Sequence, residues 1–270
     1  MVEINTKYKI GVRRFGLINW IGIYSYFKRE VSRFLIVAGQ TLFGPILTSI
    51  LFLTVISLAI GDERSNVLGV SFVEFLASGL IMMQVIQQSF SHSSSSLIMG
   101  KMMGTITDII GSPLSAAEIT IALCFASIAR GFCIALITTI IFIIFLDLSI
   151  QNYFLWFAYL FLGGFFLGSA GIIAGLYADK FDQMATITNF IIVPLSFLSG
   201  TFYSIEKLPN ILKSMSYYNP FFHMIDGFRY SFIGQSDGSI KFGIIFLLII
   251  SLTTWYISFL LYRKGYKIKS

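Results

Sequence analysis

Charged side chains are scarce in this sequence. Asp, Glu, Lys and Arg make up 12% of the 270 residues, whereas soluble domains typically carry about 25%. Hydrophobic residues make up 56% of the chain, and apolar runs long enough to cross a membrane recur along it. The composition excludes a large soluble catalytic domain and predicts an all-α polytopic membrane protein.

Histidine is equally rare, with only His92 and His223, which lie on opposite sides of the predicted membrane. No residues have the spacing of metal ligands, and no carboxylate pair occurs within one membrane layer. The phosphate-binding pattern G-x-x-x-x-G-K-[ST] is absent, because Gly100 and Lys101 lack both the earlier glycine and a following Ser or Thr. The sequence therefore predicts no catalytic residue, no metal site and no cofactor in this chain. If ATP is used, another polypeptide binds it.

Six apolar segments predict six membrane spans. They are residues 34–60, 70–90, 117–146, 154–178, 184–203 and 240–262. Residues 1–33 then form a cytoplasmic arm and residues 263–270 a basic tail, so that residues 1–270 make one transmembrane domain. In the fourth segment, Gly164/Gly168 and Gly171/Gly175 form two small-xxx-small pairs, which predict close helix packing within the chain, with a dimer contact as the alternative.

The basic residues predict how the spans are oriented. The net charge is +6, but Lys and Arg cluster at span ends, which is typical of membrane topology rather than of a nucleic-acid surface. Thirteen lie on one side of the predicted membrane and five on the other, which places both termini in the cytoplasm. The thirteen are Lys7, Lys9, Arg13, Arg14, Lys28, Arg29, Arg33, Lys101, Lys180, Arg263, Lys264, Lys267 and Lys269, and the five are Arg64, Lys207, Lys213, Arg229 and Lys241.

The segment NWIGIYSYFKREVSRF, residues Asn19–Phe34, is amphipathic at helical spacing. Asn19 could cap its start, and Trp20, Tyr24 and Tyr26 suit the level of the lipid headgroups. We interpret it as an interfacial helix on the cytoplasmic leaflet. The alternative is an N-terminal extension of the first span, bent where it begins.

Arg130 is the one basic residue inside a predicted span. Because a mid-membrane arginine costs at least about 2.5–3.5 kcal/mol, it should face protein or water. Glu118 lies twelve residues earlier, about 18 Å along a helix, so the two cannot pair directly. Arg130 either lines a cavity that attracts an anionic or polar substrate or makes structural hydrogen bonds to neighbouring helices.

Residues Ser93–Glu118 follow the second predicted span on the cytoplasmic side. A partly apolar stripe at helical spacing predicts a short amphipathic helix, which Gly111–Ser112–Pro113 ends. Such a helix could insert into a groove of a partner protein, and a loop on the membrane surface is the alternative. The stripe consists of Leu97, Ile98, Lys101, Met102, Ile106 and Ile109.

Residues Leu198–Gly234 are aromatic and amphipathic, and they predict two short helices that meet at Asn219–Pro220. Asn219 is a good N-cap and Pro220 suits the first helical position. Each helix has about ten residues, roughly 15 Å, which is half a bilayer. We expect a re-entrant pair that forms a lid or vestibule on the outer face, with a loop lying flat on that face as the alternative.

These regions together resemble the permease subunit of a bacterial type-2 ABC transporter of the multidrug or polysaccharide export branch. The resemblance rests on LSGTFYSIEKLPNILKSMSYYNPFFHMIDGFR, with its Ser-Gly, Leu-Pro and Asn-Pro pairs followed by Asp226 and Arg229. It also rests on FLASGLIMMQVIQQSFSHSSSSLIMGKMMGTITDIIGSPLSAAEI and NWIGIYSYFKREVSRFL, and it covers nearly all of the chain. One departure is Tyr203–Ser204, where many relatives have a proline nearby.

The resemblance implies an exporter half in the bacterial inner membrane. A second, identical permease would complete the pathway, and two cytoplasmic ABC ATPase subunits would bind ATP and Mg. ATPase coupling would involve Lys101, Met102, Gly104, Ile106, Asp108 and Pro113. The substrate pathway would involve Gln40, Gln84, Gln87, Gln88, Asn189 and Ser196, with Arg130 as a further candidate. The outer gate would involve Pro209, Asn219, Pro220, Asp226 and Arg229, and the last two could pair at i and i+3.

The substrate class stays open between polysaccharide, glycolipid and amphipathic drug. One alternative function is an ion-coupled secondary transporter without an ATPase, although the sequence offers no carboxylate at mid-membrane for coupling. A membrane enzyme acting on lipid-linked substrates is the other alternative, and it would depend on His92 or His223.

Overall fold

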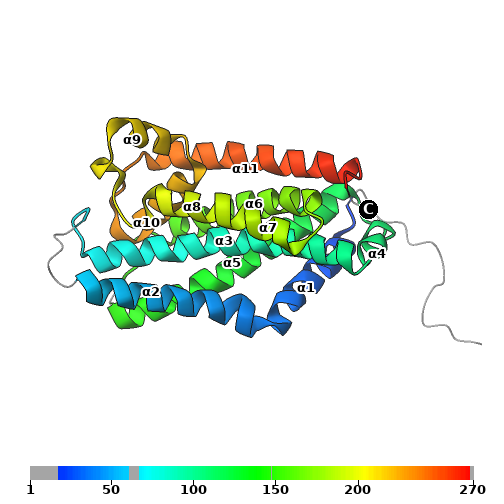
Figure 1. Ribbon diagram of the computed structural model, residues 1–270, viewed down its shortest axis with the longest axis horizontal. Helices are drawn as coiled ribbons and strands as arrows, with labels where there is room; N and C mark the ends of the chain where they lie inside the picture. Colours follow the sequence, from blue (N-terminus) through cyan, green and yellow to red (C-terminus); the bar gives the residue numbers. More distant parts are fainter. Residues whose placement is uncertain (1–17, 61–66, 147, 268–270) are drawn as a thin grey trace, which may run out of the picture.

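The computed structural model describes residues 18–60, 67–146 and 148–267. In these ranges the chain forms helices and no β-strand, so the predicted all-α class is confirmed. Long helices lie side by side along the length of one bundle, with the short helix α4 at one end and the short helix α9 at the other (Figure 1). In chain order they are α1 Trp20–Ile36, η1 Gly39–Phe43, α2 Gly44–Ile60, α3 Phe72–Met102, α4 Ile106–Ile110, α5 Ala116–Leu146, α6 Tyr153–Tyr177, α7 Phe181–Ile187, η3 Thr188–Ile192, α8 Val193–Ser196, η4 Phe197–Thr201, η5 Ile205–Lys207, α9 Asn210–Tyr217, α10 Pro220–Ile233 and α11 Ile240–Arg263.

Five helical segments of the described ranges are long and apolar enough to cross a membrane. They are Gly39–Ala59, Ala116–Leu146, Tyr153–Tyr177, Phe181–Thr201 and Ile240–Arg263, and they match five of the six predicted spans. The predicted second span lies in α3, whose glutamines and serines make it less apolar. A sixth span is therefore still a prediction.

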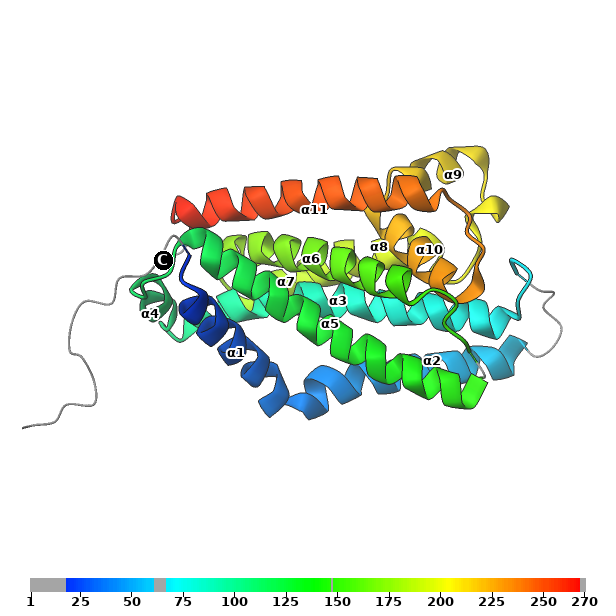
Figure 2. The same ribbon diagram turned by 180° about the vertical axis from the view of Figure 1, so that it is seen from behind.

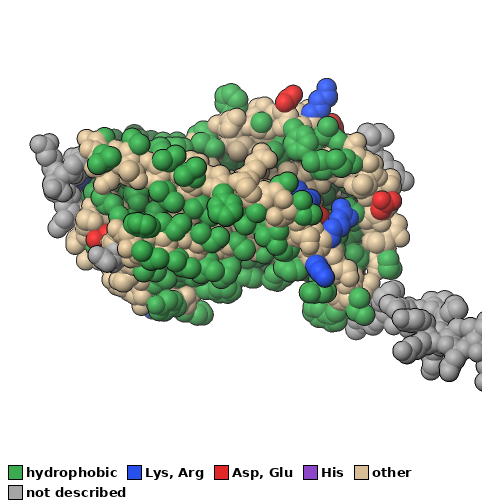
Figure 3. All heavy atoms as spheres, turned by 90° about the horizontal axis from the view of Figure 1, so that it is seen from below, with side chains coloured by type: hydrophobic (Ala, Val, Ile, Leu, Met, Phe, Trp, Pro, Cys, Tyr) green, Lys and Arg blue, Asp and Glu red, His purple; other side chains and the backbone are tan. Residues whose placement is uncertain are grey.

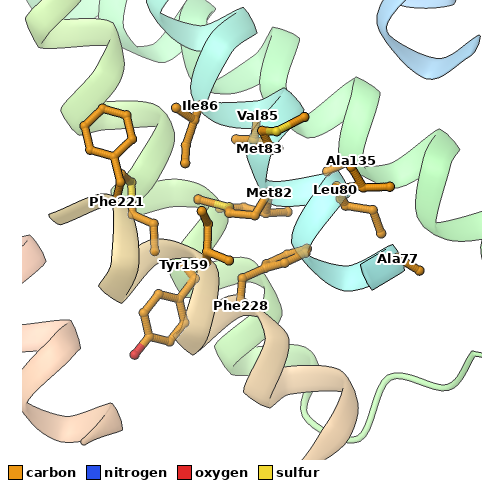
Figure 4. Close-up of a cluster of buried hydrophobic side chains, with 14 of the residues drawn as sticks. Ala77, Leu80, Met82, Met83, Val85, Ile86, Ala135, Tyr159, Phe221 and Phe228 are labelled. Atoms are coloured by element: carbon orange, nitrogen blue, oxygen red, sulfur yellow. The ribbon is translucent and has the colours of Figure 1, made fainter. Parts of the chain in front are cut away.

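Helix α3 occupies the centre of the bundle, where it packs against α2, α5, α6 and α10. Figure 4 shows Leu80, Met82 and Ile86 of α3 in a buried cluster with Tyr159 of α6 and Phe228 of α10. Because protein rather than lipid surrounds α3, its polar side chains can be satisfied by neighbouring helices.

Helix α3 continues as one helix to Met102, beyond the predicted end of the second span at residue 90, and the point at which it leaves the membrane stays a prediction. The serines at positions 91–96 do not end it. Ser94 donates its hydroxyl to the carbonyl of Phe90 at 2.8 Å, and Ser93 donates to the carbonyl of Gly168 in α6 at 2.7 Å. A serine run inside a bundle can stay helical when its hydroxyls find carbonyls in this way.

The four glycines of α6 bring it close to its neighbours, as the packing interpretation predicts. A Cβ at Gly164 or Gly168 would meet α5 at Ile128 or Ser127, respectively. A Cβ at Gly171 or Gly175 would meet the backbone of α3. Both small-xxx-small pairs thus form contacts within the chain.

Helix α1 is separate from the first span. Asn19 caps its start by accepting a hydrogen bond from the Gly22 N–H at 2.9 Å, which confirms the predicted cap. Val37 leaves the helical conformation (φ −108°, ψ 35°) after α1, and the π-helical turn η1 leads into α2. Figures 1 and 2 both show α1 inclined to α2, rather than continuing it straight. Its place on the membrane surface stays a prediction.

The two regions singled out as functional lie at opposite ends of the bundle (Figure 2). Helix α4 is at one end with the start of α1, and α9 and α10 are at the other. Figure 3 shows a mostly hydrophobic face, on which Lys and Arg gather towards the α4 end. Six of the basic residues used above to predict the orientation lie outside the described residues: Lys7, Lys9, Arg13, Arg14, Arg64 and Lys269.

Gly171→Ala should destabilise the bundle, because the new Cβ would lie 2.4 Å from the Phe90 carbonyl oxygen and 2.2 Å from the Ser93 hydroxyl. Overpacking of this kind costs about 1–3 kcal/mol, so thermal unfolding in detergent should begin several degrees lower. Gly39→Ala is the matched control, because among the described residues no atom beyond its own chain neighbours and helix backbone lies within 4 Å of its added Cβ. Equal melting temperatures for the two variants would contradict the close α3–α6 contact.

Candidate functional site

The chain between α3 and α5 forms a protruding tip at one end of the bundle. Gly104 has φ +73°, a left-handed conformation that suits glycine, and it turns the chain from α3 into α4. Ile106 and Ile109 of α4 are buried against the bundle, whereas Asp108 and Pro113 are exposed. The tip therefore has one side that packs against the bundle and one exposed, outer side. Of the predicted coupling residues, Met102, Gly104, Asp108 and Pro113 are exposed.

Lys101 supports the tip from inside. Its ammonium donates to the carbonyls of Leu176 at 2.6 Å and Ala178 at 3.1 Å, which are free acceptors at the end of α6. Asp179 lies 3.8 Å away. Burial lowers the pKa of Lys101, and the Asp179 carboxylate opposes that shift. In this conformation Lys101, like Ile106, positions the tip and does not form its surface.

The start of α1 is tied to the same tip. The Asn19 N–H donates to a Glu118 carboxylate oxygen at 2.6 Å, and the Asn19 side-chain amide donates to the Pro113 carbonyl at 3.0 Å. The other Glu118 oxygen accepts from the Ser115 N–H at 2.6 Å, and the Ser115 hydroxyl accepts from the Glu118 N–H at 3.3 Å. Ser115 and Glu118 form a capping box at the start of α5, and Asn19 adds a third partner to it.

A buried polar cluster joins the second half of α1 to α3, and the sequence analysis missed it. The Glu30 side chain is 0% exposed. Its carboxylate accepts from Arg33 Nε at 3.0 Å and from the Ser96 hydroxyl at 2.8 Å, and His92 Nε2 lies 3.8 Å away. Arg33 also donates to the His92 carbonyl at 3.0 Å. The one available signal was the i, i+3 spacing of Glu30 and Arg33 beside a histidine in the next helix.

Arg130 lies in α5 and is almost fully buried. One of its terminal nitrogens donates to the Gln88 side-chain oxygen of α3, whereas its Nε has no hydrogen-bond partner among the described residues. The contact with Gln88 supports the structural interpretation of Arg130. The free Nε leaves the substrate-attracting interpretation open.

The other predicted pathway residues differ in their exposure. Gln84 and Ser196 are buried, and Ser196 donates to the Ile192 carbonyl at 2.7 Å. Gln87 is half-buried, and Gln40 and Asn189 are exposed. Gln40 lies in η1 and Asn189 in η3, so both exposed amides belong to π-helical turns, which occur frequently at functional sites.

At the opposite end, α10 is buried between α3, α6 and α11. Asp226 and Arg229 are 2% and 1% exposed. The prediction that they pair directly is wrong, because no ion pair joins them within the described ranges. Arg229 donates to the Gly200 carbonyl at 2.6 Å, and Asp226 accepts from the N–H groups of Asp237 and Gly238, both at 2.9 Å. They anchor α10 to the flanking loops.

Helix α9 is more exposed than α10 and borders a groove of about 410 Å³ with the end of the fifth span. Asn219 caps α10 by accepting from the Phe221 N–H at 3.0 Å, and Pro220 occupies the first turn, so both predictions for these residues are confirmed. The amide of Asn219 also donates to the Ser199 hydroxyl at 2.8 Å. The groove is lined by Leu195, Leu198, Tyr203, Leu208, Leu212, Met215, Ser216, Tyr218, Asn219 and Pro220.

Comparison with known proteins decides what kind of membrane protein this is. The family profile described as ABC-2 type transporter matches residues 22–233. The chain belongs to this family. It is the multi-pass membrane component of an ABC transporter, as its sequence motifs led us to expect.

Named relatives agree with the family. The chain is 29% identical over 234 residues to inner membrane transport permease YadH of Escherichia coli (strain K12), covering 86% of this chain and 91% of that protein. It is 22% identical over 262 residues to Nodulation protein J of Rhizobium leguminosarum bv. viciae, covering 92% and 95% of the two chains. A Nodulation protein J of Neorhizobium galegae is 23% identical over 257 residues, covering 92% and 94%.

Glu30→Gln should weaken the attachment of α1 to α3, because it leaves Arg33 without a counter-charge. Breaking a buried ion pair typically costs about 3–5 kcal/mol, and the partial exposure of Arg33 reduces this to about 2–3 kcal/mol. The measurement is thermal unfolding of the purified chain, with the exposed Glu206→Gln as control. If both variants melt alike, the cluster does not hold α1 in place.

Proposed function

We propose that this chain is the permease half of an ATP-driven exporter in the bacterial inner membrane. Two copies form the substrate pathway, and two cytoplasmic ABC ATPase subunits drive it with ATP and Mg. The substrate is a polysaccharide, a glycolipid or an amphipathic drug. Six spans cross the membrane, α3 being the second, and both termini are cytoplasmic.

The tip carries this proposal. It is braced by Lys101 against α6 and by Asn19 against α1, while its outer side presents Met102, Asp108 and Pro113. A loop that served only to connect two spans would not need support from two further helices. A braced projection is suited to transmit a push from a bound ATPase into α3 and α5.

The exposed amides of Gln40 and Asn189 support a shared pathway. Neither side chain has a hydrogen-bond partner within the described ranges, although both lie in otherwise apolar spans. An unpartnered amide that faces lipid is costly. By contrast, the exposed Thr253 of α11 donates to its own helix at the Ile249 carbonyl. The first and fifth spans are therefore the faces that meet a second copy or a wet pathway.

The outer gate would consist of a fixed helix, α10, and a mobile helix, α9. Asp226 and Arg229 fix α10 within the bundle, and Asn219 and Pro220 start it at the rim of the outer groove. Pro209 precedes the more exposed α9. In this arrangement α9 is the element that moves and α10 is its support.

An ion-coupled secondary transporter is the second candidate, and Glu30 is the observation that favours it. The sequence offered no carboxylate at mid-membrane, whereas the structure buries Glu30 of α1 beside His92 of α3. Buried ionisable groups of this kind are used in proton relays. Transport in vesicles that contain only this chain, driven by an ion gradient and lost in Glu30→Gln, would establish this candidate over the exporter.

Asp108→Arg should disrupt coupling, because it reverses the charge of an exposed residue on the tip. The tagged chain is extracted in mild detergent, the co-purifying proteins are identified, and ATP hydrolysis is measured in the same sample. We expect a stoichiometric ATPase with the unmodified chain, and its loss or uncoupled hydrolysis in Asp108→Arg.

Asp182→Arg is the matched control, because Asp182 is an exposed carboxylate in the first turn of α7, outside the tip. It should retain the ATPase and its coupled hydrolysis. Absence of any ATPase under several mild extraction conditions would overturn the proposal. Equal effects of the two variants would remove the assignment of coupling to the tip.

A further inference from the structure

A groove of about 410 Å³ lies beside the tip, between the end of α4, the start of α5 and the end of α11. Because α5 and α11 are both candidate spans, it lies where two spans meet the membrane surface. Its walls are mostly aliphatic, and a tyrosine and an arginine stand on the α11 side. The lining residues are Ile110, Leu114, Ala116, Ile119, Tyr262, Arg263 and Gly265.

Arg263 brings an uncompensated positive charge to the groove. No ion pair joins its guanidinium to a carboxylate within the ranges that the structure describes. The carboxylate at the start of α5, Glu118, already accepts two backbone N–H groups. The neighbouring Lys264 adds a second exposed positive charge. A ligand of the groove should therefore carry negative charge.

We propose that the groove binds one anionic phospholipid. An acyl chain lies along Ile110, Leu114, Ala116 and Ile119, and the phosphate lies at Arg263. The aliphatic walls argue against a free phosphate, and the unpaired arginine argues against a neutral lipid. The groove lies at the inner leaflet if the proposed orientation holds. The chemistry of the lipid does not depend on that orientation.

The experiment is native mass spectrometry of the full chain, purified in mild detergent and supplied with phosphatidylglycerol or phosphatidylcholine. We expect one phosphatidylglycerol to be retained per chain in preference to phosphatidylcholine. Because a basic residue near a membrane surface is worth about 1 kcal/mol towards an anionic lipid, Arg263→Gln should lower phosphatidylglycerol retention about fivefold. Lys180→Gln is the matched control, since Lys180 is an exposed lysine that does not line the groove, and it should retain the lipid.

Ala116→Leu tests the acyl-chain part without changing charge, because its larger side chain fills the groove. It should lower retention while Arg263 is intact, and the melting temperatures of all variants are compared to confirm folding. Equal retention of both lipids by the unmodified chain would overturn the proposal, as would unchanged retention in Arg263→Gln. Displacement of the lipid by soluble glycerol phosphate would show a free-phosphate site instead. This measurement involves no ATPase. A negative result would therefore overturn the lipid proposal and leave the exporter proposal unchanged.

Discussion

The architecture depends on the need to satisfy a polar helix at the centre of an apolar bundle. Helix α3 carries glutamines, serines and a histidine through a region where water is scarce, and each unsatisfied polar group there would cost free energy. Its neighbours supply the partners. Ser93 reaches a carbonyl of α6 because Gly171 permits a close approach, Gln88 accepts from Arg130 of α5, and Ser96 donates to Glu30 of α1. Three helices are thus fixed to α3 by hydrogen bonds as well as by packing.

The same arrangement explains what could be predicted from the sequence. Continuous apolar runs of membrane-spanning length are visible in the sequence, so α5, α6 and α11 were placed to within a few residues. The caps at Asn19 and Asn219 follow from local chemistry and were also found. The continuation of α3 was missed because serines in a bundle interior look the same in sequence as serines leaving a membrane. The Ser93 hydroxyl of α3 finds its acceptor 75 residues away, which no local pattern reveals.

Site residues were harder to place for a related reason. An amphipathic pattern assigns charged residues to water, so the sequence analysis did not single out Glu30, which the fold buries. Helical spacing predicted that Asp226 and Arg229 pair. Instead, Asp226 accepts hydrogen bonds from loop N–H groups, and Arg229 donates to a loop carbonyl. Lys101 was predicted to take part in ATPase coupling, and its direction is set by the free carbonyls at the end of α6. Spacing locates such residues along the chain, whereas tertiary contacts decide which way they point.

The two attachments of α1 also constrain how the protein is made. Asn19 binds Glu118, 99 residues later, and Glu30 binds Ser96, 66 residues later. Chains are synthesised from the N-terminus at about 5–20 residues per second, so α1 leaves the ribosome several seconds before either partner exists. During that interval the Glu30 carboxylate has no protein partner on α3 and stays hydrated. Helix α1 can therefore take its final position only after α3 and the start of α5 have emerged, which makes its docking a late step of biogenesis despite its place at the beginning of the chain.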